Sequence, residues 1–157
     1  MGAHASGGDK LAEWSASGLV FKDSVEVVAV PDPEVTGVTL YISDFKRSLT
    51  DKLAKDFFSE PSQASVTCVA APSTSFDPAR IEGREGREVF SETKGLSLIK
   101  NKTLRIRRVY DAASNTAIYV AYSTRVTSAA DDGVSSGRYR TSICAVPLGA
   151  NLAAAAQ

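Results

Sequence analysis

The second half of the chain contains TLRIRRVYD (103–111), the polar loop AASN (112–115) and TAIYVAYS (116–123). Two runs rich in Val, Ile and Tyr on either side of a short polar loop predict an antiparallel β-hairpin. The second arm is apolar on both faces, with Ile118 and Val120 on one and Ala117 and Tyr119 on the other. We therefore expect this arm to be a central strand that is covered on both sides.

In the first arm of the hairpin, the alternation of apolar residues is interrupted by a charged residue. Leu104 and Ile106 share a face, and continued alternation would place Arg108 and Tyr110 on the same face. Either a bulge between Arg107 and Arg108 resets the register, or Arg108 is partly buried beside an acidic partner. The residues leave both interpretations open.

Four polar residues gather at one end of this hairpin: Arg108, Tyr110, Asp111 and Asn115. Asp can hold a turn by accepting a backbone amide, and Asn tolerates a positive φ. One hypothesis is that the four form a small polar recognition site. The other, which we favour, is that they fix the turn and satisfy a buried arginine.

Further strands follow on either side of the hairpin. Alternating or β-branched runs predict them over 24–30, 38–43, 64–70, 88–92 and 141–146. The only strong helix signal is Ser48–Phe58, with an apolar stripe of Leu49, Leu53 and Phe57 that would plug one open end. The predicted fold is mainly β (α+β): an antiparallel sheet curled into a sandwich or partial barrel with one packed helix.

The chain of 157 residues has the length of one domain. We expect a flexible segment over 1–17, in which Leu11 and Trp14 could form a short helical turn. A folded domain would occupy 18–148, and the Ala-rich tail 149–157 would be frayed. Within the domain, residues 72–87 are expected to form a long exposed loop with a brief helical turn at Pro78–Ile81.

The charges balance overall, with 18 basic and 18 acidic residues, so nothing predicts binding to nucleic acid. They are unevenly distributed along the chain. Residues 1–60 carry ten acids and six bases, whereas residues 77–108 carry nine bases and five acids. The basic segment could steer an acidic partner, or it could simply be a solvated face.

The residue types offer little for catalysis. The only histidine, His4, lies in the N-terminal segment, which argues against a Ser-His or Cys-His nucleophile. Clustered metal ligands and a phosphate-binding loop are absent from the sequence, so we expect a protein that is not an enzyme and has no cofactor or metal. No apolar run approaches the roughly 20 residues of a transmembrane helix, although peripheral membrane association stays open.

Two cysteines, Cys68 and Cys144, each lie in an alternating run on a face of small or apolar residues. If the two strands are neighbours, a disulfide could close a loop of roughly 75 residues and contribute about 4 kcal/mol. Otherwise, both would be buried free thiols that behave as small apolar groups. Sequence cannot decide between the two.

The order and spacing of seven short segments resemble the CreA protein family over residues 18–148. The segments are DPEV (32–35), VTLYIS (38–43), ASVTC (64–68), EVF (88–90), RVYDAASN (108–115), AIYVAYS (117–123) and SICAVPL (142–148). The resemblance implies an extracytoplasmic protein of the bacterial periplasm or of the chloroplast thylakoid lumen, with the targeting peptide absent from this chain. It carries no established enzymatic activity.

The chain departs from the family pattern at several positions. Leu40 stands where many bacterial members carry a cysteine that could pair with the one at Cys68, and Cys144 stands where relatives often carry serine. The Ser48–Phe58 segment replaces a glycine-rich segment, which puts any function located there in doubt. These departures and the Ala-rich tail favour a plastid-derived member.

Together these observations predict a non-catalytic binding or accessory module for a protein assembly, such as a thylakoid complex if the source is photosynthetic. The partner would bind the 72–87 loop, the 127–138 loop and the basic 94–108 region. The alternative is a small-molecule-binding protein, or an unrecognised enzyme, with a pocket inside the curled sheet.

Overall fold

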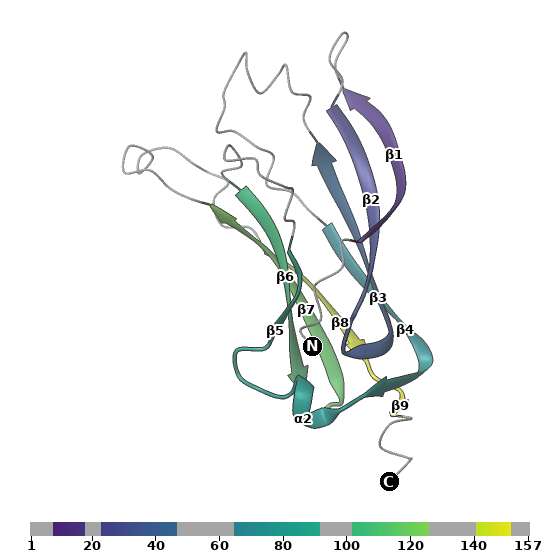
Figure 1. The fold of residues 1–157 in the computed structure, drawn as a ribbon, viewed down its shortest axis with the longest axis vertical. Helices are drawn as coiled ribbons and strands as arrows, with labels where there is room; N and C mark the ends of the chain where they lie inside the picture. The colour runs from purple at the N-terminus through teal and green to yellow at the C-terminus, as the bar shows by residue number, and fades with distance from the viewer. Residues whose placement is uncertain (1–7, 18–22, 47–64, 92–101, 126–140, 152–157) are drawn as a thin grey trace.

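The computed structural model describes residues 8–17, 23–46, 65–91, 102–125 and 141–151 (Figure 1). Within these ranges the chain forms strands and one short helix. In order they are β1 Asp9–Ser17, β2 Asp23–Pro31, β3 Val35–Lys46, β4 Ser65–Phe76, α2 Pro78–Ile81, β5 Arg87–Ser91, β6 Lys102–Asp111, β7 Thr116–Arg125, β8 Thr141–Pro147 and β9 Ala150–Asn151.

The strands form two sheets that face each other (Figure 1). One sheet has the order β1-β2-β3-β4-β9 and the other β5-β6-β7-β8. All pairs are antiparallel except the short parallel contact between β4 and β9. The sheets stay separate and do not close into a barrel. This confirms the prediction of a mainly β fold with antiparallel sheets in a sandwich.

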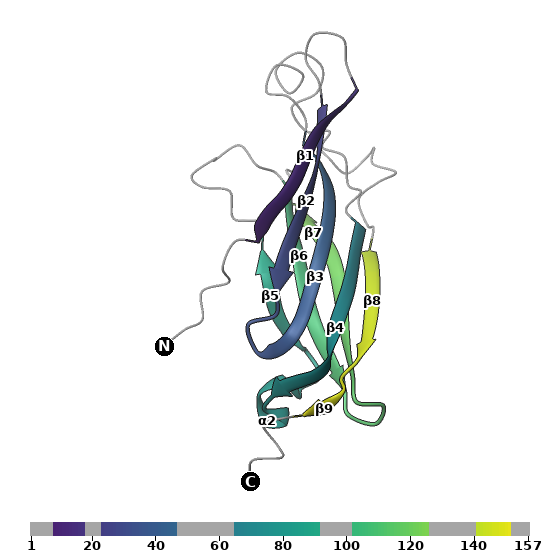
Figure 2. The same ribbon diagram turned by 90° about the vertical axis from the view of Figure 1, so that its right-hand side faces the viewer.

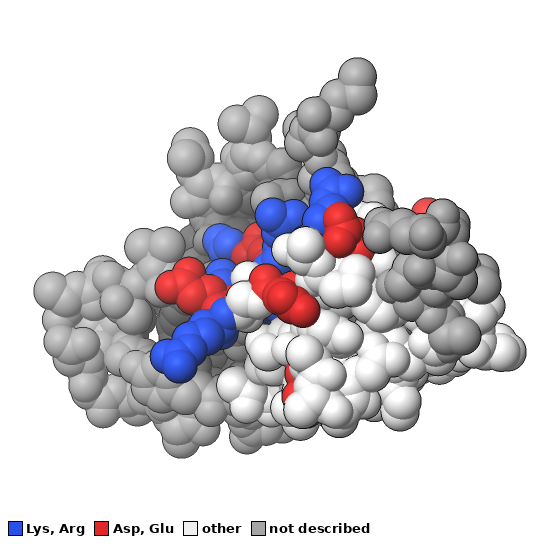
Figure 3. All heavy atoms as spheres, turned by 90° about the horizontal axis from the view of Figure 1, so that it is seen from below, with Lys and Arg blue, Asp and Glu red and all other residues white. Residues whose placement is uncertain are grey.

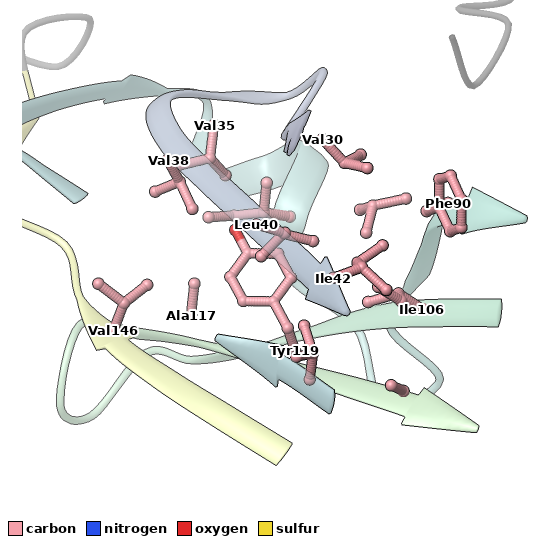
Figure 4. Close-up of a cluster of buried hydrophobic side chains, with 14 of the residues drawn as sticks. Val30, Val35, Val38, Leu40, Ile42, Phe90, Ile106, Ala117, Tyr119 and Val146 are labelled. Atoms are coloured by element: carbon pink, nitrogen blue, oxygen red, sulfur yellow. The ribbon is translucent and has the colours of Figure 1, made fainter. Parts of the chain in front are cut away.

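Strand alternation places the core between the two sheets. In β3, Val38, Leu40 and Ile42 are buried, whereas the side chains between them are half-buried or exposed, as their alternation predicts. Ile106 and Tyr119 meet them from the second sheet (Figure 4). Since each sheet buries one face, the sandwich holds a single continuous core.

The central hairpin is confirmed as β6 and β7, which pair without a break from Lys102↔Arg125 to Asp111↔Thr116. Of the two alternatives for Arg108, the bulge at Arg107–Arg108 is therefore wrong, and the buried arginine is confirmed. β7 lies between β6 and β8, so its central position is confirmed. Its predicted cover on both sides is wrong, because Ile118 and its neighbours on the outer face are only half-buried.

The expected flexible or helical N-terminal segment is wrong for residues 9–17. These residues form β1, in which Trp14 pairs with Val25 of β2. The spacing of Leu11 and Trp14 fits a helical turn, but ladder hydrogen bonds to β2 outweigh this weak local preference. At the other end, Ala150 and Asn151 of the predicted tail form β9.

β4 also extends further than predicted and reaches Phe76, into the segment expected to be an irregular loop. The register between β3 and β4 shifts from Thr36↔Ser75 to Val38↔Ala70. Gly37 adopts φ 98 at this shift. The extra residues of β4 include Pro72, which lacks an N–H and is tolerated where the ladder is interrupted.

The helical turn at Pro78–Ile81 is confirmed as α2. The side chain of Asp77 caps it by accepting the amide of Ala79 at 3.0 Å. The predicted Ser48–Phe58 helix and the 127–138 loop lie outside the described residues. Within the described part, no helix is long and apolar enough to span a membrane.

Candidate functional site

The turn between β2 and β3 points a carboxylate into the protein. Asp32 lies between Pro31 and Pro33 and is 5% exposed. Its Oδ1 accepts the amides of Glu34 at 2.8 Å and Val35 at 3.2 Å, and its own amide donates to the Val38 carbonyl at 3.0 Å. The two prolines restrict φ on either side, so the turn holds this carboxylate in one orientation.

Arg108 of β6 meets that carboxylate from the opposite sheet. Its Nη1 lies 2.5 Å from Oδ1 and 2.7 Å from Oδ2 of Asp32, and both side chains are fully buried. The hydroxyl of Tyr119 donates to the same Oδ2 at 2.7 Å. Arg108 also pairs through Nη2 with Glu34, whose other carboxylate oxygen pairs with Arg87. We call these five residues the arginine cluster.

The arginine cluster balances its own charge, because two guanidinium groups face two carboxylates. Burial would lower the pKa of Arg108, but the charge and hydrogen bonds of Asp32 raise it above its usual range. Burial, and then the charge of Asp32, raise the pKa of Tyr119. Tyr119 therefore stays a hydrogen-bond donor and Arg108 stays charged at physiological pH, as a structural ion pair requires.

Tyr110 and Asn115 form a second connection beside the cluster. The Tyr110 hydroxyl donates to Asn115 Oδ1 at 3.0 Å, and Asn115 Nδ2 donates to the Leu148 carbonyl at 2.7 Å. The Leu148 amide returns a bond to the Asn115 carbonyl at 2.9 Å. Asn115 has φ 49, a conformation that asparagine tolerates better than most residues. These bonds fasten the chain after β8 to the β6–β7 turn.

Asp111 has a local role in that turn. Its Oδ2 accepts the Ser114 hydroxyl at 2.7 Å, and its Oδ1 accepts the Ala113 amide at 3.1 Å. The bond from Ser114, followed by the backbone amides, lowers the pKa of this exposed carboxyl. The structure thus brings Arg108, Tyr110, Asp111 and Asn115 to one end of the hairpin but gives them three separate tasks. Their hydrogen bonds support the structural interpretation.

Sequence reasoning offered a buried Arg108 with an acidic partner as one of two alternatives, and it did not identify that partner. Asp32, Glu34 and Tyr119 were missed as members of the cluster. One signal pointed to them: an acidic N-terminal part of the chain and a basic 77–108 segment. In the structure, Glu34 and Asp32 from the first part bind Arg87 and Arg108 from the second.

Other bases of the 77–108 segment are also engaged within the protein. Arg105 pairs with Glu88 at 2.8 Å, and Arg107 donates to the Glu85 carbonyl at 2.7 Å. Figure 3 shows acidic and basic side chains intermixed at this end of the molecule. In the described part of the segment, the interpretation as a solvated, locally paired face fits better than a broad basic surface for an acidic partner.

Cys68 of β4 and Cys144 of β8 are joined in a disulfide, with Cα atoms 6.0 Å apart. The alternative of two free thiols therefore does not hold in this structure. The bond links the two sheets, because β4 and β8 belong to different ones. Leu40 lies directly opposite Cys68 in the β3–β4 register. Among the described residues, no cluster of His, Cys, Asp and Glu could hold a metal ion.

These features define a class of protein: a two-sheet antiparallel β domain with a disulfide between the sheets and a buried ion cluster in the core. The family described as CreA protein matches residues 12–151, nearly the whole chain. The chain therefore belongs to the CreA protein family. No curated protein and no solved structure matches it significantly.

Proposed function

We propose that this CreA-family chain is a non-catalytic binding or accessory module of a protein assembly outside the cytoplasm. In a bacterium the compartment would be the periplasm. In a photosynthetic source, the chain would be a lumenal or peripheral partner of a thylakoid complex. One observation carries the binding role: the exposed loop between α2 and β5 is held in a fixed shape.

This loop, Glu82–Gly86, is fixed at both ends. Ile81 is 3% exposed and anchors the preceding helix in the core. On the other side, the Gly86 amide donates to the Gly83 carbonyl at 3.2 Å, and Arg107 donates to the Glu85 carbonyl at 2.7 Å. A loop that is already ordered loses little conformational entropy when a partner binds.

The outer surface of this loop carries alternating charges. Glu82, Arg84 and Glu85 are exposed, as is Arg80 of α2. Such charges set the orientation and identity of a protein partner more than they set affinity. A rigid, exposed and mixed-charge loop therefore supports specific protein recognition at the end of the sandwich shown in Figure 3.

The remaining parts of the proposal have their own support. The disulfide favours an oxidising compartment, because such bonds are rare in cytosolic proteins. The non-catalytic role is supported by the arginine cluster, in which Arg108, Asp32 and Tyr119 are bound to one another in the core. A group that is buried and paired in this way serves folding more readily than proton transfer.

A retention experiment with native periplasmic or thylakoid-membrane extracts tests the proposal. The double variant Glu82→Lys/Arg84→Glu reverses the loop charges without changing the net charge. Lys10→Glu/Glu13→Lys, on β1, is the matched control because it likewise exchanges two exposed side chains of opposite charge without changing the net charge. We expect the wild type and the control to retain the same protein, and the loop variant to lose it.

A thermal-shift screen with metabolites runs beside the retention experiment. Strong stabilisation by a metabolite, with no protein retained, would overturn the proposal in favour of the small-molecule alternative. Equal retention of one protein by all three forms would contradict the role of this loop.

A further inference from the structure

Two fastenings between the sheets lie at different sides of the sandwich. Among the described residues, the two sheets share no ladder hydrogen bonds. The arginine cluster ties the β2–β3 turn to β5 and β6, which form one half of the second sheet. The Cys68–Cys144 bond ties β4 to β8, at the other margin of that sheet (Figure 2). Of these two fastenings, the disulfide is the one that a redox reaction can open and close.

The Cys68–Cys144 bond lies where both sheets end. β8 is the last strand of its sheet, and β9 pairs with β4 only at Ser73 and Thr74. In the described part of the chain, neither sheet therefore adds a further strand beside the bond. Both cysteines are half-buried, whereas the side chain of Arg108 is fully buried. This position leaves the disulfide open to approach from solvent, while Arg108 is enclosed.

We propose that the Cys68–Cys144 bond is a redox site, which an external dithiol reduces and thereby releases the β4–β8 side of the sandwich. The first thiolate of the dithiol attacks one sulfur atom of the bond and forms a mixed disulfide, and its second thiolate then attacks that mixed disulfide. Each attack displaces one cysteine as a thiolate, which takes up one of the two protons that the dithiol loses. Two electrons thus pass to the protein, and the dithiol ends as a disulfide. The reverse reaction closes the bond again.

The structure limits how far the release extends. Beside the two cysteines, the inward side chains of β4 and β8 include Ala70 and Ser142, which are small and half-buried, so little apolar packing remains there once the bond opens. Further along the chain, β9 follows β8 and pairs with β4, which holds the far end of this side together. We therefore expect local opening over 65–70 and 141–146, while the arginine cluster holds the other side. Val66 lies in this stretch and is 7% exposed in the oxidised protein, so reduction exposes part of the core.

Reduction kinetics in the absence of denaturant test whether the folded protein reacts. Dithiothreitol serves as the dithiol, and alkylation followed by intact-mass measurement counts the free thiols over time. We expect a rate proportional to the dithiothreitol concentration and equal in the wild type and in Ile106→Val, a core variant on β6. The variant should raise the unfolded population about two- to tenfold, because it removes a buried methylene group. A reduction rate that rises by the same factor would show that only unfolded protein reacts, and would overturn the proposal.

Two-dimensional amide NMR spectra of the oxidised and reduced protein locate the released part. We expect the amide shifts to change over 65–70 and 141–146 and to stay unchanged in the β2–β3 turn and in β6 around Arg108. Cys68→Ser/Cys144→Ser should reproduce the reduced spectrum without dithiothreitol. Changes confined to the two cysteines, or spread over all strands, would overturn the proposal. Neither measurement involves a partner of the Glu82–Gly86 loop, so the outcome is independent of the proposed function.

Discussion

Arg108 illustrates how one side chain in this fold can be buried and charged at once. It is 1% exposed, yet both Asp32 and Glu34 bind its guanidinium group. Its Nε is buried and has no hydrogen-bond partner among the described atoms, so the pairing leaves one donor unsatisfied. A buried ion pair of this kind adds little net stability, but removing one partner destabilises the protein strongly, because the charge of the other partner is left buried without compensation.

Arg108→Met should therefore lower the free energy of unfolding by about 3–5 kcal/mol, since it leaves the Asp32 carboxylate buried without its cation. Arg107→Met is the matched control on the same strand, and should cost no more than about 1 kcal/mol, because its guanidinium group is at the surface. Urea unfolding measures both. A stable Arg108→Met protein that loses a protein partner would support the recognition hypothesis instead.

Glu34 gives the cluster a pH dependence. Burial raises the pKa of Glu34, but the hydrogen bonds and charges of Arg108 and Arg87 lower it by more than burial raises it. The net pKa is therefore below the ordinary value of 4.5. The folded state therefore binds the proton less tightly than the unfolded state. The stabilisation is fully present above about pH 4.5 and is lost as the pH falls through the folded pKa.

We accordingly expect the free energy of unfolding to fall more steeply in the wild type than in Glu34→Gln as the pH is lowered below about 4.5. Chemical unfolding at a series of pH values provides the comparison. Glu82→Gln, which removes a carboxylate from the exposed loop, controls for the loss of one negative charge. Parallel pH curves for the wild type and Glu34→Gln would argue against the paired carboxylate.

At the scale of elements, the loop before β5 depends on a close approach between the backbone at Gly86 and the backbone of β6 at Arg108. A Cβ atom at Gly86 would lie 2.1 Å from the Arg108 carbonyl oxygen, and Gly86 also has φ +61. Gly83 has φ +136, but a Cβ there would meet nothing within 4 Å. An alanine at Gly86 would therefore suffer both a steric clash and backbone strain, whereas an alanine at Gly83 would suffer backbone strain alone.

Gly86→Ala should destabilise the protein by about 3 kcal/mol or more, because β5 and β6 must move apart as well as accommodate strain. Gly83→Ala should cost only about 1–2 kcal/mol, from strain alone. Thermal and urea unfolding of the two variants tests this order. Equal losses would show that the contact with Arg108 does not constrain the loop.

At the scale of the whole molecule, the disulfide fastens one side of the sandwich. Cys68 and Cys144 are 76 residues apart in sequence and come from sheets that share no ladder hydrogen bonds. Closing a loop of this length restricts the unfolded chain strongly. The bond is thus expected to stabilise the arrangement of the two sheets.

Reduction should lower the free energy of unfolding by about 4 kcal/mol, and Cys68→Ser/Cys144→Ser should match the reduced wild type. Alkylation under non-reducing, denaturing conditions, followed by intact-mass measurement, reports the oxidation state directly. No alkylated thiol is expected in protein from an oxidising compartment. Two alkylated thiols would rule out the bond in that sample.

The sequence by itself determined most of the segments that become strands and which side chains of those strands face inward. Val38, Leu40 and Ile42 alternate with polar neighbours, and this period-2 pattern holds whatever the partner strand is. Local turn chemistry likewise predicted α2 and the β6–β7 turn. Where local signals were weak, as in β1, the prediction was wrong, because pairing with β2 decided the conformation.

Only the tertiary structure decided which distant groups meet. Asp32 pairs with Arg108 because the two sheets face each other and bring these residues, 76 positions apart in sequence, into contact. The same packing joined Cys68 of one sheet to Cys144 of the other. Alternation fixes the face of a side chain but carries no information about the opposite sheet, so these partners follow from packing alone.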